Sequence, residues 1–151
     1  MIKEIVENGQ GMTRNERPET TLEIFLRFFG DTLIPDEVTK ILGCSPTDIG
    51  TKGDKVTEDG GRTYPRHTGK WILEVPPQSP FNADQQINAV LGKLPSDLEI
   101  WRTLRSRFKL ELDLLLVLRS GVDRNNDLLI SSGTLEALGQ REIELDVRFI
   151  V

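Results

Sequence analysis

Three stretches of the chain alternate hydrophobic and polar residues with a period of two, the pattern of a β-strand with one buried face. They cover residues 21–29, 109–119 and 142–151. A shorter stretch, residues 70–75, alternates in the same way and ends at a Pro-Pro pair, which we expect to stop the strand. The polar positions are mostly charged, so we expect a sheet of at least four strands with one face in a core and the other toward water.

A helix is predicted over residues 35–42. Pro35 suits the first helical position because its missing N–H would be unpaired there in any case. Lys40 favours the negative end of the helix dipole, and Gly43 can adopt the left-handed conformation that ends a helix. The hydrophobic stripe of this helix consists of Ile34, Val38, Ile41 and Leu42.

Two further helices are predicted from capping signals. Asn82, with Gln85 three residues on as its reciprocal partner, begins a helix that ends at Gly92. Residues 96–99 (Ser-Asp-Leu-Glu) form a second capping box, and a helical stripe follows over residues 98–108.

The order of strand, turn, short helix and Leu-Gly occurs twice. The first copy ends at residues 42–43, and the second ends with a brief helix near residues 132–138 that Gly139 stops. Duplication into two pseudo-equivalent halves would explain this repeat, but Leu-Gly helix ends are common, and chance explains it equally well.

Together these elements predict an α+β fold, a two-layer sandwich of a mainly antiparallel or mixed sheet with helices on one face. A chain of 151 residues is typical of one domain. We place this domain at residues 20–151. Residues 1–19 are polar and lack a sustained period, so we expect a flexible N-terminal arm there.

Residues 43–71 form a long loop without a sustained period, and such loops are usually functional or disordered. The loop holds six of the thirteen glycines, the only cysteine and the only histidine. Residues 56–57 and 62–64 lie on either side of Asp59-Gly60-Gly61 and predict a small outlying hairpin.

Between residues 50 and 70, five basic side chains outnumber three acidic ones, within a chain of net charge −5. This segment suits an acidic partner, or it is only a solvated loop. The candidate ligand-binding residues of the loop are Lys52, Lys55, Arg62, Tyr64, Arg66, His67 and Trp71. Trp71 also has a simpler interpretation, as a core residue that anchors the end of the loop.

Catalytic and metal-binding motifs are not evident, and we expect no cofactor and no metal. Cys44 and His67 could serve as nucleophile and base, but nothing in the sequence places them together. Zinc requires three or four ligands, and the usual Cys/His pairs are missing. A solvated sheet face that discourages aggregation explains the acidic strand positions better than a carboxylate site does. These positions are Glu111, Asp113, Glu142, Glu144 and Asp146.

Residues 49–56 match the I-G-x-x-G-x-x-[IV] pattern of the KH module, whose loop clamps a nucleic-acid backbone. That loop joins two helices, whereas residues 57–65 here contain two glycines and a proline. The acidic net charge also argues against a general nucleic-acid binder. The phosphate-loop pattern G-x-x-x-x-G-K-[ST] is absent from the same segment.

The composition, with 37% hydrophobic and 28% charged residues, is that of an ordinary soluble globule. One cysteine permits no intramolecular disulfide. The longest purely apolar run, residues 114–118, is far shorter than the ~18 residues of a membrane span. We therefore expect a cytoplasmic protein without membrane association, and the oligomeric state stays open.

Several short motifs occur in the order that characterises one bacterial family. They are a strand, a P-D-E-V-T helix, Leu42-Gly43, Pro46-Thr47, a Lys52-Gly53 loop and Gly69-x-Trp71 at the start of a strand. In this order the chain resembles the family catalogued as domain of unknown function 4279, over about residues 20–151. The family has no assigned activity, so the resemblance implies a small, single-domain, soluble bacterial protein and no particular chemistry.

Two classes of function remain. We favour a non-catalytic protein-binding or regulatory module, a class that includes immunity proteins that neutralise a partner. The alternative is a nucleic-acid or nucleotide binder that uses the glycine-rich basic loop, residues 50–70. An enzyme is the least favoured class, because no nucleophile, metal cluster or cofactor loop stands out.

Overall fold

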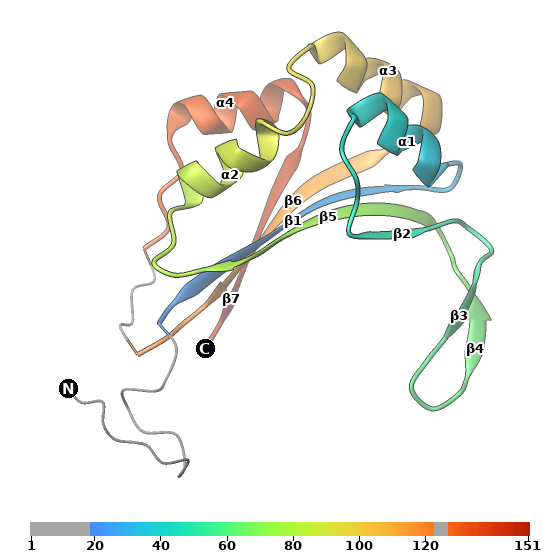
Figure 1. Cartoon of the computed structure of the whole chain (residues 1–151), viewed down its shortest axis with the longest axis horizontal. Coiled ribbons are helices and arrows are strands. Elements are labelled where there is room, and N and C mark those ends of the chain that lie inside the picture. Colours follow the sequence, from blue (N-terminus) through green and yellow to red (C-terminus); the bar gives the residue numbers. More distant parts are fainter. Residues whose placement is uncertain (1–18, 123–126) are drawn as a thin grey trace.

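The computed structural model describes residues 19–122 and 127–151, which form a sheet layer with helices on one face (Figure 1). Across the main sheet the strands are β2 (Asp48–Gly50), β5 (Gly69–Gln78), β1 (Thr21–Gly30), β6 (Glu111–Arg119) and β7 (Glu144–Ile150). A separate two-stranded sheet consists of β3 (Lys55–Thr57) and β4 (Thr63–Pro65). The helices are α1 (Pro35–Leu42), α2 (Ala83–Leu91), α3 (Leu98–Phe108) and α4 (Ser132–Gln140). The predicted α+β two-layer fold is confirmed.

The central strand is β1, which pairs antiparallel with β5 on one side and with β6 on the other. Phe28 is opposite Trp71 in β5 and opposite Leu112 in β6. At one edge β7 lies parallel to β6, and α4 provides the connection between them. At the other edge β2 pairs antiparallel with β5. The sheet is therefore mixed.

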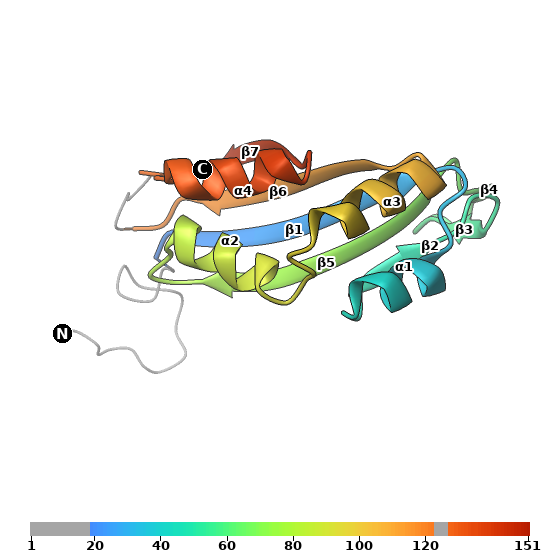
Figure 2. The same ribbon diagram turned by 90° about the horizontal axis from the view of Figure 1, so that it is seen from above.

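The core lies between the sheet and the helices, which all lie above one face in Figure 2. α1 contacts β5 and α3, α2 contacts β1, and α4 contacts β7. The ring of Phe28 meets Trp71 edge to face, with centroids 5.1 Å apart, and stacks on Trp101 at 6.0 Å. Fully buried positions of β1 and β6 alternate along the strands and are Leu22, Ile24, Leu26, Phe28, Leu114 and Leu116.

The opposite sheet face, which we call the open face, is less polar than predicted. Leu115 and Val117 point away from the helix layer, yet each is only 6% exposed. Their neighbours across the ladders, Phe25 and Asp146 for Leu115 and Glu23 for Val117, belong to the same face. An apolar strip therefore lies among the charged side chains of this face.

β5 is longer than predicted. It continues through Pro76 and Pro77 to Gln78, so the prediction that this pair stops the strand was wrong. Among the described strands, β2 is the one on the outer side of β5, and it pairs only with residues 70–72. A missing N–H that faces this side in the second half of β5 therefore breaks no ladder bond with a described strand. On the inner side the register with β1 shifts between Leu22 and Ile24.

Two strands begin later than predicted because the residue at the turn before each has a positive φ. Lys109 ends α3 with φ 51°, so the strand predicted from residue 109 begins at Glu111. Glu142 has φ 54°, and the last strand begins at Glu144. A residue in the left-handed region departs from the extended backbone of a regular strand, so each ladder begins after it.

Helix capping follows the predictions in part. Asn82 accepts a hydrogen bond from the backbone N–H of Gln85, as predicted. In return, the backbone N–H of Asn82 donates to the side-chain oxygen Oε1 of Gln86 and not to Gln85. For α3, the cap is Asp97 and not Ser96, since its carboxylate accepts from the N–H of Glu99 at 3.0 Å.

The strand-and-helix order recurs as β1–α1 and β6–α4, but the two Leu-Gly ends differ. Gly43 ends α1 with φ 67°, whereas Gly139 lies inside α4 without a positive φ. Ile34 is 45% exposed and is not part of the buried stripe of α1. A duplication therefore stays a prediction, as does the flexible arm at residues 1–19, of which residues 1–18 lie outside the described residues.

The long loop of residues 43–71 is not structureless. It contains β2, which joins the main sheet, and the hairpin of β3 and β4, which confirms the hairpin predicted around Asp59-Gly60-Gly61. The KH-like segment forms a turn between β2 and β3, so a strand and not a helix follows its glycines.

We predict that Thr39→Val lowers the free energy of unfolding by about 1–3 kcal/mol. The hydroxyl of Thr39 accepts a hydrogen bond from the indole N–H of the buried Trp71 at 3.0 Å, and valine leaves that donor unpaired. Urea unfolding measures the change. Thr63→Val, at an exposed position of β4, is the matched control and should change the free energy by less than about 0.5 kcal/mol. Equal effects of the two substitutions would contradict this account.

Candidate functional site

The predicted loop residues lie mainly on a hairpin that extends away from the sheet and the helices (Figure 1). We call residues 51–68 the hairpin arm. Lys55 is opposite Pro65 and Val56 is opposite Tyr64 in its ladder. The turn at its tip is held by the N–H of Glu58, which donates to the carbonyl of Arg62 at 2.7 Å.

The base of the arm is fixed by backbone contacts. The N–H of Gly53 donates to the carbonyl of Arg66 at 2.9 Å, and the N–H of Arg66 donates to the carbonyl of Asp54 at 2.7 Å. The carboxylate of Asp54 accepts from the N–H of Thr51 at 2.8 Å. These bonds fix the direction in which the arm leaves the sheet.

Because Gly50 has no side chain, the guanidinium of Arg66 can pack against its backbone at the base of the arm. A Cβ atom on Gly50 would lie 2.4 Å from Nε of Arg66, closer than any real contact, so a side chain at position 50 would displace the guanidinium. The Nε atom of Arg66 is buried and has no hydrogen-bond partner in the described structure. The glycine therefore permits this close approach of the Arg66 side chain.

Several basic residues of the arm and its flanks have acidic partners. The ammonium of Lys52 lies 3.2 Å from the Asp31 carboxylate, and the guanidinium of Arg62 lies 3.1 Å from Glu58. Lys70, at the start of β5, pairs with Asp48 of β2. The positive charge predicted from the sequence is thus largely neutralised locally.

The two aromatic candidates of the arm lie together. The rings of Tyr64 and His67 stack, with centroids 6.0 Å apart and an interplanar angle of 22°. His67 is exposed and Tyr64 is half-buried. Trp71 lies apart from them, fully buried in the core. Cys44 packs against the edge of the core, and no described contact joins it to His67.

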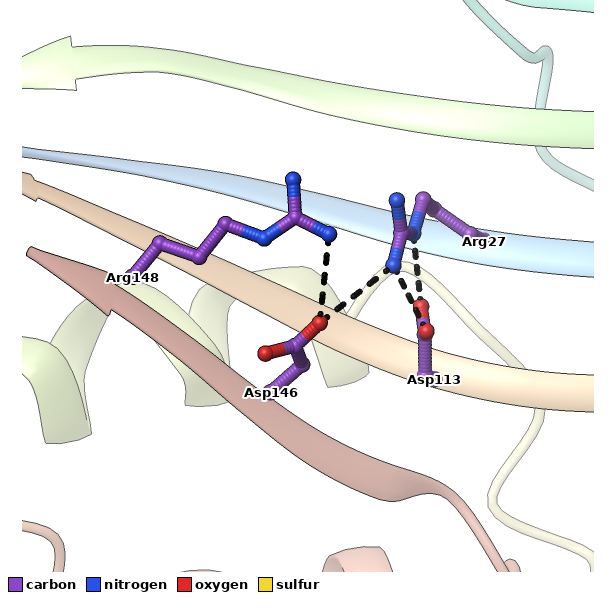
Figure 3. Close-up of polar contacts among 4 residues, drawn as sticks. All are labelled: Arg27, Asp113, Asp146 and Arg148. Carbon is purple, nitrogen blue, oxygen red and sulfur yellow. Dashed lines mark hydrogen bonds and ion pairs between the residues drawn. The ribbon is translucent and has the colours of Figure 1, made fainter.

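A second polar cluster crosses the open face of the sheet (Figure 3). Arg27 of β1 donates two hydrogen bonds of 2.7 Å to the two carboxylate oxygens of Asp113 on β6. Its guanidinium also lies 3.7 Å from Asp146 on β7, which in turn lies 3.4 Å from Arg148. The bidentate pair with Asp113 raises the pKa of Arg27. The cluster joins three neighbouring strands with balanced charge.

This cluster changes the interpretation of the acidic strand positions. Asp113 and Asp146 face Arg27, and Glu142 precedes β7 and pairs with Arg105 of α3 at 3.2 Å. In residues 19–122 and 127–151, no three His, Cys, Asp or Glu side chains are grouped to hold a metal ion. The sequence could not reveal the cluster, because the pairing depends on the order and register of three strands.

Glu23 and Glu74 form a carboxyl pair on the same face, also missed by sequence reasoning. Burial raises the pKa of Glu23, and a hydrogen bond with Glu74 and the charge of that carboxylate raise it further. Arg119, 4.0 Å from Glu23, acts in the opposite direction. Two carboxyl groups that share a hydrogen bond bind one proton more tightly than an isolated carboxyl group does.

A shallow cleft of about 550 Å³ lies at the end of the sheet nearest the arm. Its lining includes Phe29, Asp31, Thr68, Phe108, Lys109 and Glu111. A hydrogen bond from the hydroxyl of Thr68, followed by the interaction with Lys52, lowers the pKa of Asp31. These contacts connect the arm to the body of the protein.

The fold and these surfaces define a small two-layer α+β domain with a projecting hairpin. The family model described as "Domain of unknown function (DUF4279)" matches residues 19–151, so the chain belongs to this family and the resemblance seen in the sequence is confirmed. Comparison with curated proteins and with solved structures found no match. None of the helices in the described part of the chain has the length and apolarity needed to span a bilayer.

We predict that Glu23→Gln stabilises the protein at pH 7 relative to wild type. The folded pKa of Glu23 lies above its ordinary value of 4.5, so its stabilising contribution is complete below that value and is lost as the pH rises through the folded pKa. In urea unfolding, the free energy of unfolding of the variant should therefore rise relative to that of wild type between pH 4 and pH 7.

The control for this prediction is Glu111→Gln, an exposed carboxylate at the start of β6. It should follow the pH dependence of wild type. A Glu23→Gln curve parallel to wild type over the whole range would show that the proton on this carboxyl pair does not contribute to stability.

Proposed function

We propose that this DUF4279 protein is a non-catalytic binding module that recognises another protein through its hairpin arm. The observation that carries the proposal is the position of the arm, which extends beyond the core and contributes no fully buried side chain to it (Figure 1). A two-stranded hairpin is at best marginally stable alone, so this one depends on the bonds at its base. Ordered segments outside a core are frequently binding elements.

The side chains near the end of the arm are of the kinds found at protein interfaces. The stacked rings of Tyr64 and His67 offer a rigid aromatic surface, and Tyr and Arg are enriched among the residues that dominate binding energy. Lys55 lies on the neighbouring strand, and no ion pair joins it to any other described residue. Because Val56 and not Lys55 is opposite Tyr64, the lysine and the tyrosine belong to opposite faces of the hairpin. This arrangement fits a protein partner that contacts both faces of the arm, with an apolar pocket for the rings and a carboxylate for the lysine.

The local charges favour a protein over a nucleic acid. Affinity for phosphates grows with the number of basic side chains that can reach them. Lys52, Arg62 and Lys70 already have carboxylate partners, so few unpaired cations are left along the arm. A protein interface needs only a small number of anchoring residues.

The first experiment is photocrosslinking in cells of the source organism, with a photoreactive phenylalanine in place of His67. We expect an adduct of defined mass with one protein. The same amino acid in place of Lys93, exposed between α2 and α3, is the matched control and should give no such adduct. Identical adducts from both positions would argue against recognition by the arm.

The partner so identified is then tested with purified proteins by calorimetry. Tyr64→Ala with Lys55→Glu should weaken binding at least about tenfold, because an aromatic anchor and a charge are both lost. Lys93→Glu should leave the affinity unchanged. Salt-sensitive binding of short single-stranded RNA at low ionic strength, abolished by Lys52→Ala with Lys55→Ala, would instead support the nucleic-acid function.

A further inference from the structure

Within residues 19–122 and 127–151, β7 leaves one long edge of the main sheet unpaired. It is the outermost strand, and no other described strand pairs with its outer side. The opposite edge strand, β2, has three residues, whereas β7 has seven. β7 contains no proline, and its register with β6 runs without a bulge. Proline and a bulge, two of the devices that prevent pairing at a sheet edge, are therefore missing from β7, and its charged residues Glu144, Asp146 and Arg148 are the device that it carries.

The backbone direction of β7 identifies the groups at this edge. The carbonyl of Ile150 accepts a hydrogen bond from the N–H of Ser120, so Ile150 faces the side of β6. Backbone groups alternate between the two sides of a strand. The N–H and C=O groups of Leu145, Val147 and Phe149 therefore point outward, where they can form hydrogen bonds with another strand.

The sequence of β7 is self-complementary around Val147. If a second copy pairs antiparallel with Val147 opposite Val147, then Asp146 lies opposite Arg148 of the second copy, and Arg148 opposite its Asp146. On the other face, Leu145 lies opposite Phe149. This register also places outward-facing residues opposite each other, as a hydrogen-bonded antiparallel pair requires.

Neighbouring registers are less complementary at the twofold axis. A shift of two residues places either Asp146 opposite Asp146, with Glu144 then opposite Arg148, or Arg148 opposite Arg148, and like charges directly opposite are destabilising. A shift of one residue places outward-facing backbone groups opposite inward-facing ones and charged side chains opposite apolar ones. The register centred on Val147 pairs all seven residues, places Asp146 opposite Arg148 and leaves no like charges opposite each other; at its ends Glu144 lies opposite Ile150.

The side chains at this edge are accessible. Phe149 is 59% exposed and Ile150 is 41% exposed, although both are large apolar residues of a strand. The guanidinium of Arg148 lies 3.4 Å from the carboxylate of Asp146 in its own chain. In the dimer it can therefore lie between this carboxylate and the Asp146 carboxylate of the second copy. Pairing would cover Phe149 with Leu145 of the second copy.

We propose that β7 pairs with β7 of a second copy, so that two molecules form one continuous ten-stranded sheet around a twofold axis at Val147. An isologous contact of this kind is closed and stops at the dimer. A single strand pair is a small interface, so we expect a weak dimer with a dissociation constant on the order of micromolar. Dimerisation through β7 involves neither the hairpin arm nor its partner. The dimer proposal and the proposed function of the arm can therefore fail independently.

The test is sedimentation velocity of the full chain from ~1 to ~500 µM at low salt. Wild type should show a concentration-dependent change from monomer to dimer. Asp146→Arg, which leaves two arginines at the edge, and Arg148→Asp, which leaves two aspartates, should each weaken dimerisation about tenfold or more. An equimolar mixture of these two variants should dimerise, because the altered charges are then opposite across the pair.

Glu111→Arg makes the same change of charge as Asp146→Arg, but on β6 away from the edge, and it should dimerise like wild type. The mixture also tests folding, since a misfolded variant could not pair. A monomer at every concentration would overturn the proposal. So would a wild-type dimer that both single variants retain, or one that their mixture fails to restore.

Discussion

The ring of Phe28, between the indoles of Trp71 and Trp101, joins the two layers of this protein. The N–H of Trp71 donates to Thr39 and so ties β5 to α1, and the N–H of Trp101 donates to the carbonyl of Pro95, in the turn that precedes its own helix α3. One aromatic contact thereby fixes β1, β5 and two helices relative to one another. Because buried indole N–H groups require partners, these positions tolerate few other arrangements.

The location of the core determines where recognition can occur. All helices cover one face of the sheet, which leaves the hairpin arm, the open face and the β7 edge outside the core. The cluster around Arg27 stabilises the β7 edge indirectly, because it ties β7 to β6 and β1 through Asp146 and Asp113. The edge strand is therefore anchored within its own sheet.

Local patterns predicted the elements well, because strand alternation and helix caps depend on residues close in sequence. The layer of helices on one face followed from the same alternation. The pairing of strands did not, and neither did the contacts that depend on it, such as Arg27 with Asp113 or Glu23 with Glu74. The prolines of β5 show the reason: whether Pro76 stops a strand depends on a neighbour that the local sequence does not reveal.

The central place of β1 also affects how the chain folds as it is made. Arg27 and Asp113 are 86 residues apart, and synthesis adds roughly 5–20 residues per second. The hydrophobic row of β1 therefore emerges roughly 4–17 seconds before β6 exists to pair with it. Of the two neighbours of β1 in the sheet, only β5 is then present, so one side of β1 stays unpaired until β6 is made, and such long-range pairing is slow to form.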